Sequence, residues 1–217
     1  KALKKRTGKD LYVYATKLST HFEEVYSAEH SPRMRVTDAV RRSMSIPLFF
    51  KAVFDDRDDI IVDGGVLNNY PVKLFDRKKY LVDASLKRIP EYYKKENELF
   101  AKTHPNSSPY IYNKETLGFR LDSAKEIAVF RDAQEPQHYK IENFLDYSIH
   151  LIKTFMDAQS NQHLHSDDWH RTIYIDTLGV GATDFDLTDT KKQELLLSGR
   201  KATEKYFEWW DDTSKDV

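Results

Sequence analysis

Alternating apolar and polar positions predict several strands along the chain. In residues 10–16, Leu11, Val13 and Ala15 alternate with two tyrosines, the two-residue period of a half-buried strand. The same reasoning predicts strands in FEEVYS (22–27, weaker), DIIVDGG (59–65), YLVDAS (80–85) and RTIYIDT (171–177). Most of these runs are short and rich in β-branched or aromatic residues, so each is expected to pair within a sheet.

A longer period predicts helices between these strands. Val36, Ala39, Val40 and Ser43 recur at helical spacing, with Thr37 or Asp38 as the expected cap and Pro47 as the stop. An amphipathic helix is predicted in KIENFLDYSIHLIKTFMDAQ (140–159), a closing helix in TDTKKQELLLSGRKATEKYFEWW (188–210), and a short helical turn in YPVKLF (70–75). Helices and strands therefore alternate, which favours an α/β layer fold.

Composition narrows the function classes. The 217 residues are 40% apolar, enough for one sizeable globular core. Lys and Arg total 34 against 35 Asp and Glu, so no overall positive field indicates a nucleic-acid partner. Cysteine is absent, which excludes disulfides, thiolate metal sites and a cysteine nucleophile. The apolar runs are far shorter than the roughly 18 residues that a membrane span needs.

Two blocks carry the chemical signal. The first is DAVRRSMSIPLFF (38–50), a helix that a proline ends; the second is VDGGVLNNYPV (62–72), a strand that ends in Asp63, Gly64 and Gly65. Together they resemble the patatin-like phospholipases, acyl hydrolases with a Ser–Asp dyad. The matching positions are Arg41, Ser43, Met44, Ile46, Pro47, Phe50, Asp63, Gly64, Gly65, Asn69 and Pro71. Arg42 and Ser45 depart from the family, which usually has small residues there; the resemblance is firmest over residues 11–85.

The resemblance implies a fold and a domain plan. It implies a layered, mostly parallel sheet flanked by helices, with a helical insertion and a C-terminal helical extension. Residues 1–88 would form the C-terminal half of the catalytic core. The charged, aromatic, proline-broken residues 89–122 would be an insertion or cap, and residues 123–217 would pack on the core.

The resemblance also assigns a role to Asp63. A serine nucleophile needs a neighbouring base, and in a dyad the carboxylate accepts the proton directly. Gly64 and Gly65 would let another backbone approach and would permit positive φ. The alternative is that Asp63 only opens a turn, as Asp-Gly commonly does. The implied substrates are phospholipid or lysophospholipid esters, with no cofactor and no metal.

One family element is absent from the sequence. None of the seven glycines flanks a serine in the Gly-x-Ser-x-Gly elbow that holds the nucleophile. Ser43 and Ser45 lack the flanking glycines that a strained elbow requires. We expect the serine and the oxyanion donors on an N-terminal segment of the same protein, and no turnover by this chain alone. The rival from another class is a catalytically silent patatin-like module for binding or regulation; a third possibility is an unrelated α/β domain.

Three weaker signals remain. His163, His165, Asp167, Asp168 and His170 could bind a transition metal, but a solvated polar connector is the simpler interpretation. The basic run KALKKRTGK (1–9) could touch anionic headgroups, although a solvated helix end is the simpler interpretation. The localisation is unknown from the sequence, with a cytoplasmic or membrane-peripheral protein favoured. The aromatics of the insertion could line an acyl pocket or pack on the core; they are Tyr92, Tyr93, Phe100, Tyr110, Tyr112 and Phe119.

Overall fold

The chain forms two compact units. The structure is a computed structural model that describes residues 1–83, 87–132, 135, 138–162 and 166–212. The first unit comprises Lys1–Tyr70 and His138–Leu164, and the second comprises Pro71–Gln137 and His165–Val217. The domain plan with boundaries at residues 88 and 122 stays a prediction, and each compact unit is described below by itself.

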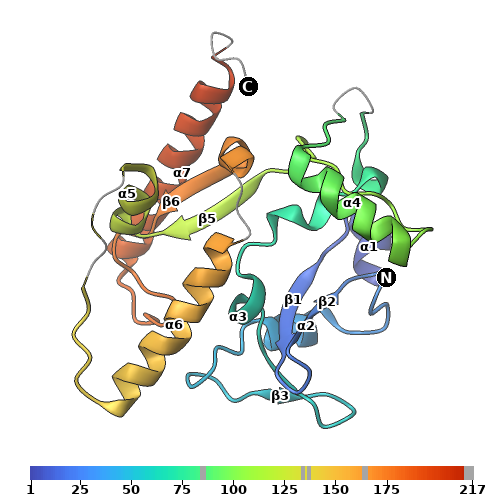
Figure 1. Ribbon diagram of the computed structural model, residues 1–217. Coiled ribbons are helices and arrows are strands. Elements are labelled where there is room, and N and C mark those ends of the chain that lie inside the picture. Colours follow the sequence, from blue (N-terminus) through green and yellow to red (C-terminus); the bar gives the residue numbers. More distant parts are fainter. Residues whose placement is uncertain (84–86, 133–134, 136–137, 163–165, 213–217) are drawn as a thin grey trace. The chain divides into compact units, whose positions relative to one another are not determined.

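The first unit is built on a four-stranded sheet. Its elements are α1 (Ala2–Thr7), β1 (Val13–Lys17), β2 (Phe22–Tyr26), α2 (Val36–Ser43), β3 (Val53–Phe54), β4 (Ile60–Asp63), α3 (Gly65–Asn68) and α6 (Phe144–Gln162). The strand order is β2-β1-β4-β3. Figure 1 shows β1 and β2 side by side, with α2 beside them. The strands predicted in residues 10–16, 22–27 and 59–65 and the helix predicted from Val36 to Ser43 are thus confirmed.

The described strands do not confirm the mostly parallel sheet that the resemblance implies. All three pairings of the four-stranded sheet are antiparallel. Short connections explain two of them, because a parallel pair needs a crossover of about a dozen residues or more. His21 and Asp58 lie in these two tight connections with positive φ values of 61° and 59°. The parallel pairing that does occur joins two strands of the second unit.

The core of the first unit lies between α2 and the sheet. Ala15, Tyr26, Ala39 and Ile61 are all buried and form one apolar cluster. Ala39 contributes from α2, whereas Val36 and Val40 of the same apolar period are 44% and 43% exposed. The cap differs from the prediction: α2 begins directly after Arg35, and Asp38 pairs with the Arg35 guanidinium instead of capping the backbone.

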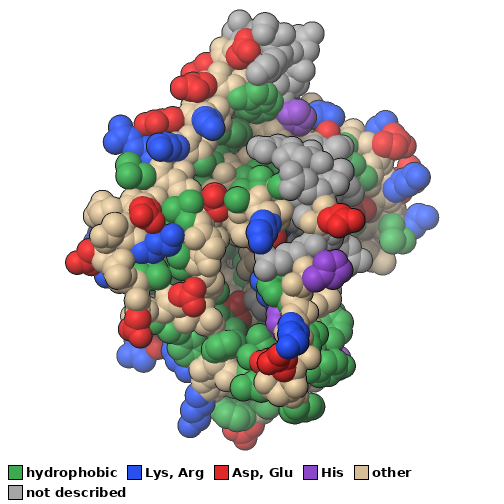
Figure 2. All heavy atoms as spheres, turned by 90° about the vertical axis from the view of Figure 1, so that its left-hand side faces the viewer, with side chains coloured by type: hydrophobic (Ala, Val, Ile, Leu, Met, Phe, Trp, Pro, Cys, Tyr) green, Lys and Arg blue, Asp and Glu red, His purple; other side chains and the backbone are tan. Residues whose placement is uncertain are grey.

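Helix α6 packs against α3 but leaves much apolar surface exposed. Phe144 is 83% exposed, and Leu145 and Phe155 are each 59% exposed. Apolar side chains are also visible on the molecular surface in Figure 2. The amphipathic helix is thus confirmed as a helix, while part of its apolar face is not covered within its own unit. No helix in the described part of the chain is both long and apolar enough to cross a membrane.

The second unit combines helices with a two-stranded parallel sheet. Its elements are η1 (Val72–Phe75) and η2 (Lys78–Tyr80), both 3₁₀ helices, α4 (Glu91–Thr103), β5 (Gly118–Asp122), α5 (Ala124–Asp132), η4 (Ser166–Arg171), also 3₁₀, β6 (Thr172–Asp176) and α7 (Asp189–Trp210). Strand β5 pairs with β6 from Gly118 opposite Thr172 to Asp122 opposite Asp176. Thr188 caps α7 by accepting a hydrogen bond from the Lys191 N–H at 3.2 Å.

One sequence prediction fails in this unit. The strand expected at residues 80–85 is not formed by its described part: Tyr80 ends η2 and Val82 is 89% exposed. The Val82 N–H donates to the Glu115 carboxylate rather than to a neighbouring strand, so no ladder forms there. Ala84 and Ser85 lie outside the described residues. Strand β5 lies in the segment for which an insertion or cap is expected, and its parallel partner β6 lies about fifty residues further along the chain.

Candidate active site

Asp63 occupies the last position of β4, as the sequence predicts. The two preceding residues, Ile61 and Val62, are 0% and 3% exposed, and Asp63 itself is half-buried opposite Ala15 of β1. This burial raises the pKa of the Asp63 carboxyl above its ordinary value. The Gly65 N–H donates to Asp63 Oδ1 at 2.7 Å, and this hydrogen bond lowers the pKa of the carboxyl. The result is a carboxylate fixed on one side and made more basic by its surroundings.

The hydrogen bond to Gly65 is also the bond of an Asx turn. A carboxylate that accepts from the N–H two residues later opens a turn, and Gly64 then precedes the short helix α3. The turn interpretation is therefore correct about local geometry. It uses only one of the two carboxylate oxygens. In the part of the chain that the structure describes, Asp63 Oδ2 has no hydrogen-bond partner and Asp63 no ion pair, so a base role remains compatible with the turn.

Gly64 allows a close backbone approach rather than a positive φ. Its φ is −65° and its ψ is −28°, values that any residue can adopt. A Cβ atom on Gly64 would lie 2.6 Å from the carbonyl oxygen of Tyr14 in β1 and 2.7 Å from the carbonyl carbon. One of the two reasons expected for these glycines thus holds at Gly64, and the positive φ is not used there.

The block after α2 holds the backbone of the Asp63 turn. The Asp63 N–H donates to the Ser45 carbonyl oxygen at 3.0 Å, and the Gly64 N–H donates to the Ser43 carbonyl oxygen at 3.4 Å. Ser45 is 0% exposed, and its hydroxyl is hydrogen-bonded to Arg41. The two sequence blocks are thus adjacent in space, and the buried Ser45 hydroxyl has a structural role, in line with its missing elbow glycines.

The polar cluster near residue 165 does not form a metal site in the described residues. His163 and His165 lie outside them. Asp167 pairs with Arg88 at 3.1 Å, and Asp168 is fully buried against Arg171. His170 stacks on Trp209. No group of three or more metal-binding side chains occurs where the structure is described.

A buried charge network in the second unit was not predicted. Arg171 is 2% exposed and donates to both carboxylate oxygens of Asp76, at 2.5 and 2.7 Å, and to Asp168 Oδ1. Asp76 and Asp168 are 0% exposed, and the Tyr93 hydroxyl also donates to Asp76. Burial opposes the charge on Arg171, but the hydrogen bonds and charges of the two aspartates raise its pKa overall. Asp76 and Arg171 are 95 residues apart, so no local pattern reveals the pair.

Most aromatics of the predicted insertion pack within the second unit. Tyr93 stacks on Tyr110 with ring centroids 5.5 Å apart, and Phe100 contacts Tyr110 edge-on. Tyr112 is 3% exposed and donates from its hydroxyl to the Asp167 carbonyl oxygen. Packing therefore explains these four rings. Phe119 is 55% exposed and follows neither expectation clearly.

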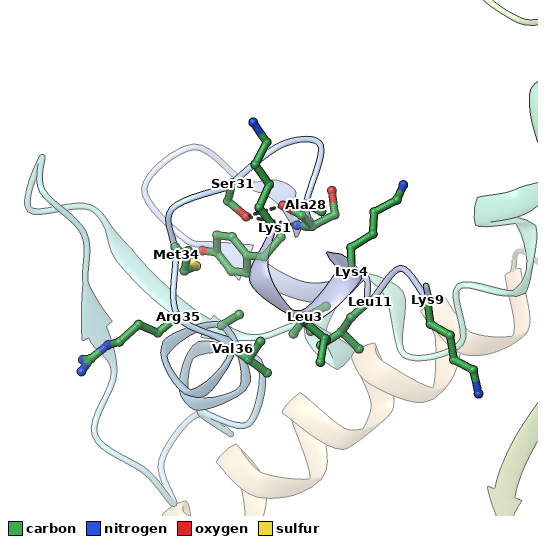
Figure 3. Close-up of a pocket in the computed structure, with 14 residues that line it drawn as sticks. Lys1, Leu3, Lys4, Lys9, Leu11, Ala28, Ser31, Met34, Arg35 and Val36 are labelled. Carbon is green, nitrogen blue, oxygen red and sulfur yellow. Dashed lines mark hydrogen bonds between the residues drawn. The ribbon is translucent and has the colours of Figure 1, made fainter. Parts of the chain in front are cut away.

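The basic N-terminal run forms helix α1 beside a small pocket. The pocket is about 50 Å³ and has an apolar floor that includes Leu3, Leu11 and Met34. Figure 3 shows Leu3 and Leu11 side by side, while the amino groups of Lys4 and Lys9 point away from them. Ligand pockets for small molecules are typically about 300–1,000 Å³, so this hollow is too small for an acyl chain with its headgroup.

Comparison with known proteins supports the assignment of the segment that contains this site. Residues 3–76 match the family model of the patatin-like phospholipases. Residues 3–76 are therefore similar to the patatin-like phospholipases, and the resemblance recognised from the two motifs is confirmed. Asp63, both glycines and the block after α2 all lie inside the matched residues.

Individual relatives match different shares of the chain. Uncharacterized protein YqhO of Bacillus subtilis (strain 168) is 27% identical over 178 residues, which are 81% of this chain and 47% of that protein. Probable lipid hydrolase 463L of Invertebrate iridescent virus 6 is 30% identical over 69 residues, 32% of this chain and 23% of that protein. The crystal structure of VipD from Legionella pneumophila is similar with a TM-score of 0.48 and 17% identity, covering 96% of this chain and 32% of that one. The chain thus spans less than half the length of these proteins.

Proposed function

We propose that the complete protein is a patatin-like lipid-ester hydrolase in which Asp63 is the general base. The observation that carries the proposal is the state of Asp63 within the family-matching segment. Burial at the end of β4 makes its carboxylate more basic, while Gly65 holds one oxygen and leaves Oδ2 without a partner among the described residues.

The proposed reaction uses a serine from a segment outside this chain. Asp63 accepts the serine hydroxyl proton as the serine oxygen attacks the ester carbonyl, and the protonated carboxyl then gives this proton to the departing alcohol. An acyl-serine remains. Asp63 next takes a proton from water, the hydroxide attacks the acyl carbonyl, and the proton returns to serine as the fatty acid leaves. Phospholipid or lysophospholipid esters are the proposed substrate class, reached through peripheral contact with a membrane surface.

A fluorophosphonate probe, which modifies activated serines, tests this division of labour. We expect labelling of the complete protein, no labelling of residues 1–217 alone, and loss of labelling in the complete protein with Asp63→Asn. Labelling of this chain alone would overturn the proposal, because it would place the nucleophile here. A complete protein that takes no label under conditions where an unrelated serine hydrolase does would favour the silent binding module instead.

A further inference from the structure

Arg41, on α2, is hydrogen-bonded to two residues of the segment that follows this helix, Ser45 and Lys51. Its guanidinium donates through Nη1 to the Ser45 hydroxyl at 2.5 Å and through Nη2 to the Lys51 carbonyl oxygen at 2.7 Å. The Ser45 hydroxyl in turn donates to the Arg41 carbonyl oxygen at 2.7 Å. One side chain on α2 thus binds both ends of the bend that residues 45–51 form.

This bend has a conformation that needs support. Leu48 has a φ of 71°, in the left-handed region, which is unfavourable for a residue with a side chain. The Phe50 N–H donates to the Ile46 carbonyl oxygen at 3.0 Å and closes the bend from inside. A left-handed residue persists only where its surroundings determine it. The two hydrogen bonds from Arg41 supply part of that support from outside.

The bend is also what holds Asp63. Ser45 accepts the Asp63 N–H through its carbonyl oxygen at 3.0 Å, and Ser45 itself is 0% exposed. We propose that Arg41 is a positioning residue for the Asp63 base, acting through Ser45 and the bend at residues 45–51. This inference rests on the proposed function, since it assigns Arg41 a part in the same active site.

The proposal predicts a kinetic effect beyond lost stability. A displacement of about 1 Å at a reacting group can cost on the order of 100-fold in rate. In the complete protein, Arg41→Ala is expected to lower kcat about 10- to 100-fold with little change in KM. The acid limb of the pH profile of kcat/KM should move to lower pH, because a looser turn admits water. Burial is the main cause of the raised pKa of Asp63, and the Gly65 N–H opposes it. Among the described residues, no charged side chain contributes to this shift.

Two further variants give the graded response that a positioning link requires. Arg41→Lys keeps the charge and can reach either Ser45 or Lys51 but not both, so an intermediate kcat is expected. Ser45→Ala removes the hydroxyl while keeping the carbonyl that holds Asp63, and should also be intermediate. Combining Ser45→Ala with Arg41→Ala should add little to the loss of Arg41→Ala alone, because both act on one connection.

Arg42→Ala is the matched control. Arg42 lies next to Arg41 on α2 but donates to the Tyr26 hydroxyl at 3.1 Å, on the core side of the helix. We expect its acid limb to stay at the wild-type pH. All rates are to be measured below the melting transition of each variant; if Arg41→Ala does not fold, Arg41→Lys and Ser45→Ala carry the test.

The outcomes separate the two proposals. Activity retained by Asp63→Asn overturns the proposed function itself. The role of Arg41 alone is overturned if Asp63→Asn is inactive while Arg41→Lys, Ser45→Ala and Arg41→Ala keep the wild-type kcat and the wild-type acid limb. A lowered melting temperature with unchanged kinetics of the folded protein also overturns it, since Arg41 would then be only a stabilising residue.

Discussion

Replacing Gly64 with alanine tests the close approach between β1 and the turn that follows Asp63. The added Cβ would lie 2.6 Å from the Tyr14 carbonyl oxygen, 0.8 Å inside the 3.4 Å at which ordinary contact begins. The Tyr14 carbonyl is a backbone group and the added Cβ is fixed to the backbone, so a rotamer change cannot relieve the contact. Either the turn or β1 has to move, and the ladder between Ala15 and Asp63 moves with it.

The expected cost follows from two opposing terms. Forced overpacking costs about 1–3 kcal/mol. Because the φ of −65° suits alanine, the substitution also restricts the unfolded chain, which stabilises the protein by about 0.4–1 kcal/mol. We expect a net destabilisation of about 1–2 kcal/mol in the first unit. In the complete protein, the displaced carboxylate should also lower ester hydrolysis, on the order of 100-fold for a shift of about 1 Å.

Amide hydrogen exchange is the suitable assay for the stability part. All three tryptophans, Trp169, Trp209 and Trp210, belong to the second unit, so their fluorescence would not report on the turn. Peptides that cover residues 13–17 and 60–68 should exchange faster in Gly64→Ala, by roughly the factor of 5–30 that about 1–2 kcal/mol corresponds to.

Gly199→Ala is the control for this prediction. Gly199 lies within α7, and its added Cβ would meet Ile175 at 3.9 Å, an ordinary contact. Alanine in a helix interior is favoured over glycine by about 0.5–1 kcal/mol, so this variant should be slightly stabilised. Equal exchange of β1 and β4 peptides in Gly64→Ala and wild type would refute the close approach of Tyr14 and the reason given for the glycine.

Three further substitutions test other parts of the structure. Asp63→Asn should abolish ester hydrolysis by the complete protein, and activity of the variant would contradict the assignment. Its melting temperature at pH 7 should be unchanged or slightly higher, because the raised pKa of Asp63 means that the ionised carboxylate destabilises the folded state. For the same reason, wild-type kcat/KM should fall as the pH drops through that raised pKa. Arg171→Met should destabilise the second unit by about 3–5 kcal/mol in urea unfolding followed by tryptophan fluorescence, because Asp76 and Asp168 would remain buried without it; a loss below about 1 kcal/mol would contradict the buried network. Thr16→Val should raise stability by about 1 kcal/mol in exchange of the β1 peptide, because the buried Thr16 hydroxyl has no hydrogen-bond partner in the described structure; destabilisation would show that the hydroxyl is satisfied.

Local patterns determined much of this protein before any packing was known. The apolar period from Val36 to Ser43 specified α2, and the run that ends at Asp63 specified β4, since both depend on residues close together in sequence. The residues of the two motifs resemble the patatin-like phospholipases, and that resemblance implies the role of Asp63. Residues 80–85 show the limit of this reasoning, because a short apolar run becomes a strand only where a neighbouring strand offers its backbone.

Tertiary structure decided what each of these residues contacts. Gly64 is glycine because the Tyr14 backbone, fifty residues earlier, leaves no room for a Cβ atom, and not because of its own φ. Ser45, a departure from the family in sequence, is the residue whose carbonyl oxygen receives the Asp63 N–H. The antiparallel order of the sheet and the burial of Arg171 between Asp76 and Asp168 likewise depend on long-range pairing. A sequence states which residues are apolar or charged, but only the tertiary structure determines which of them are buried against one another.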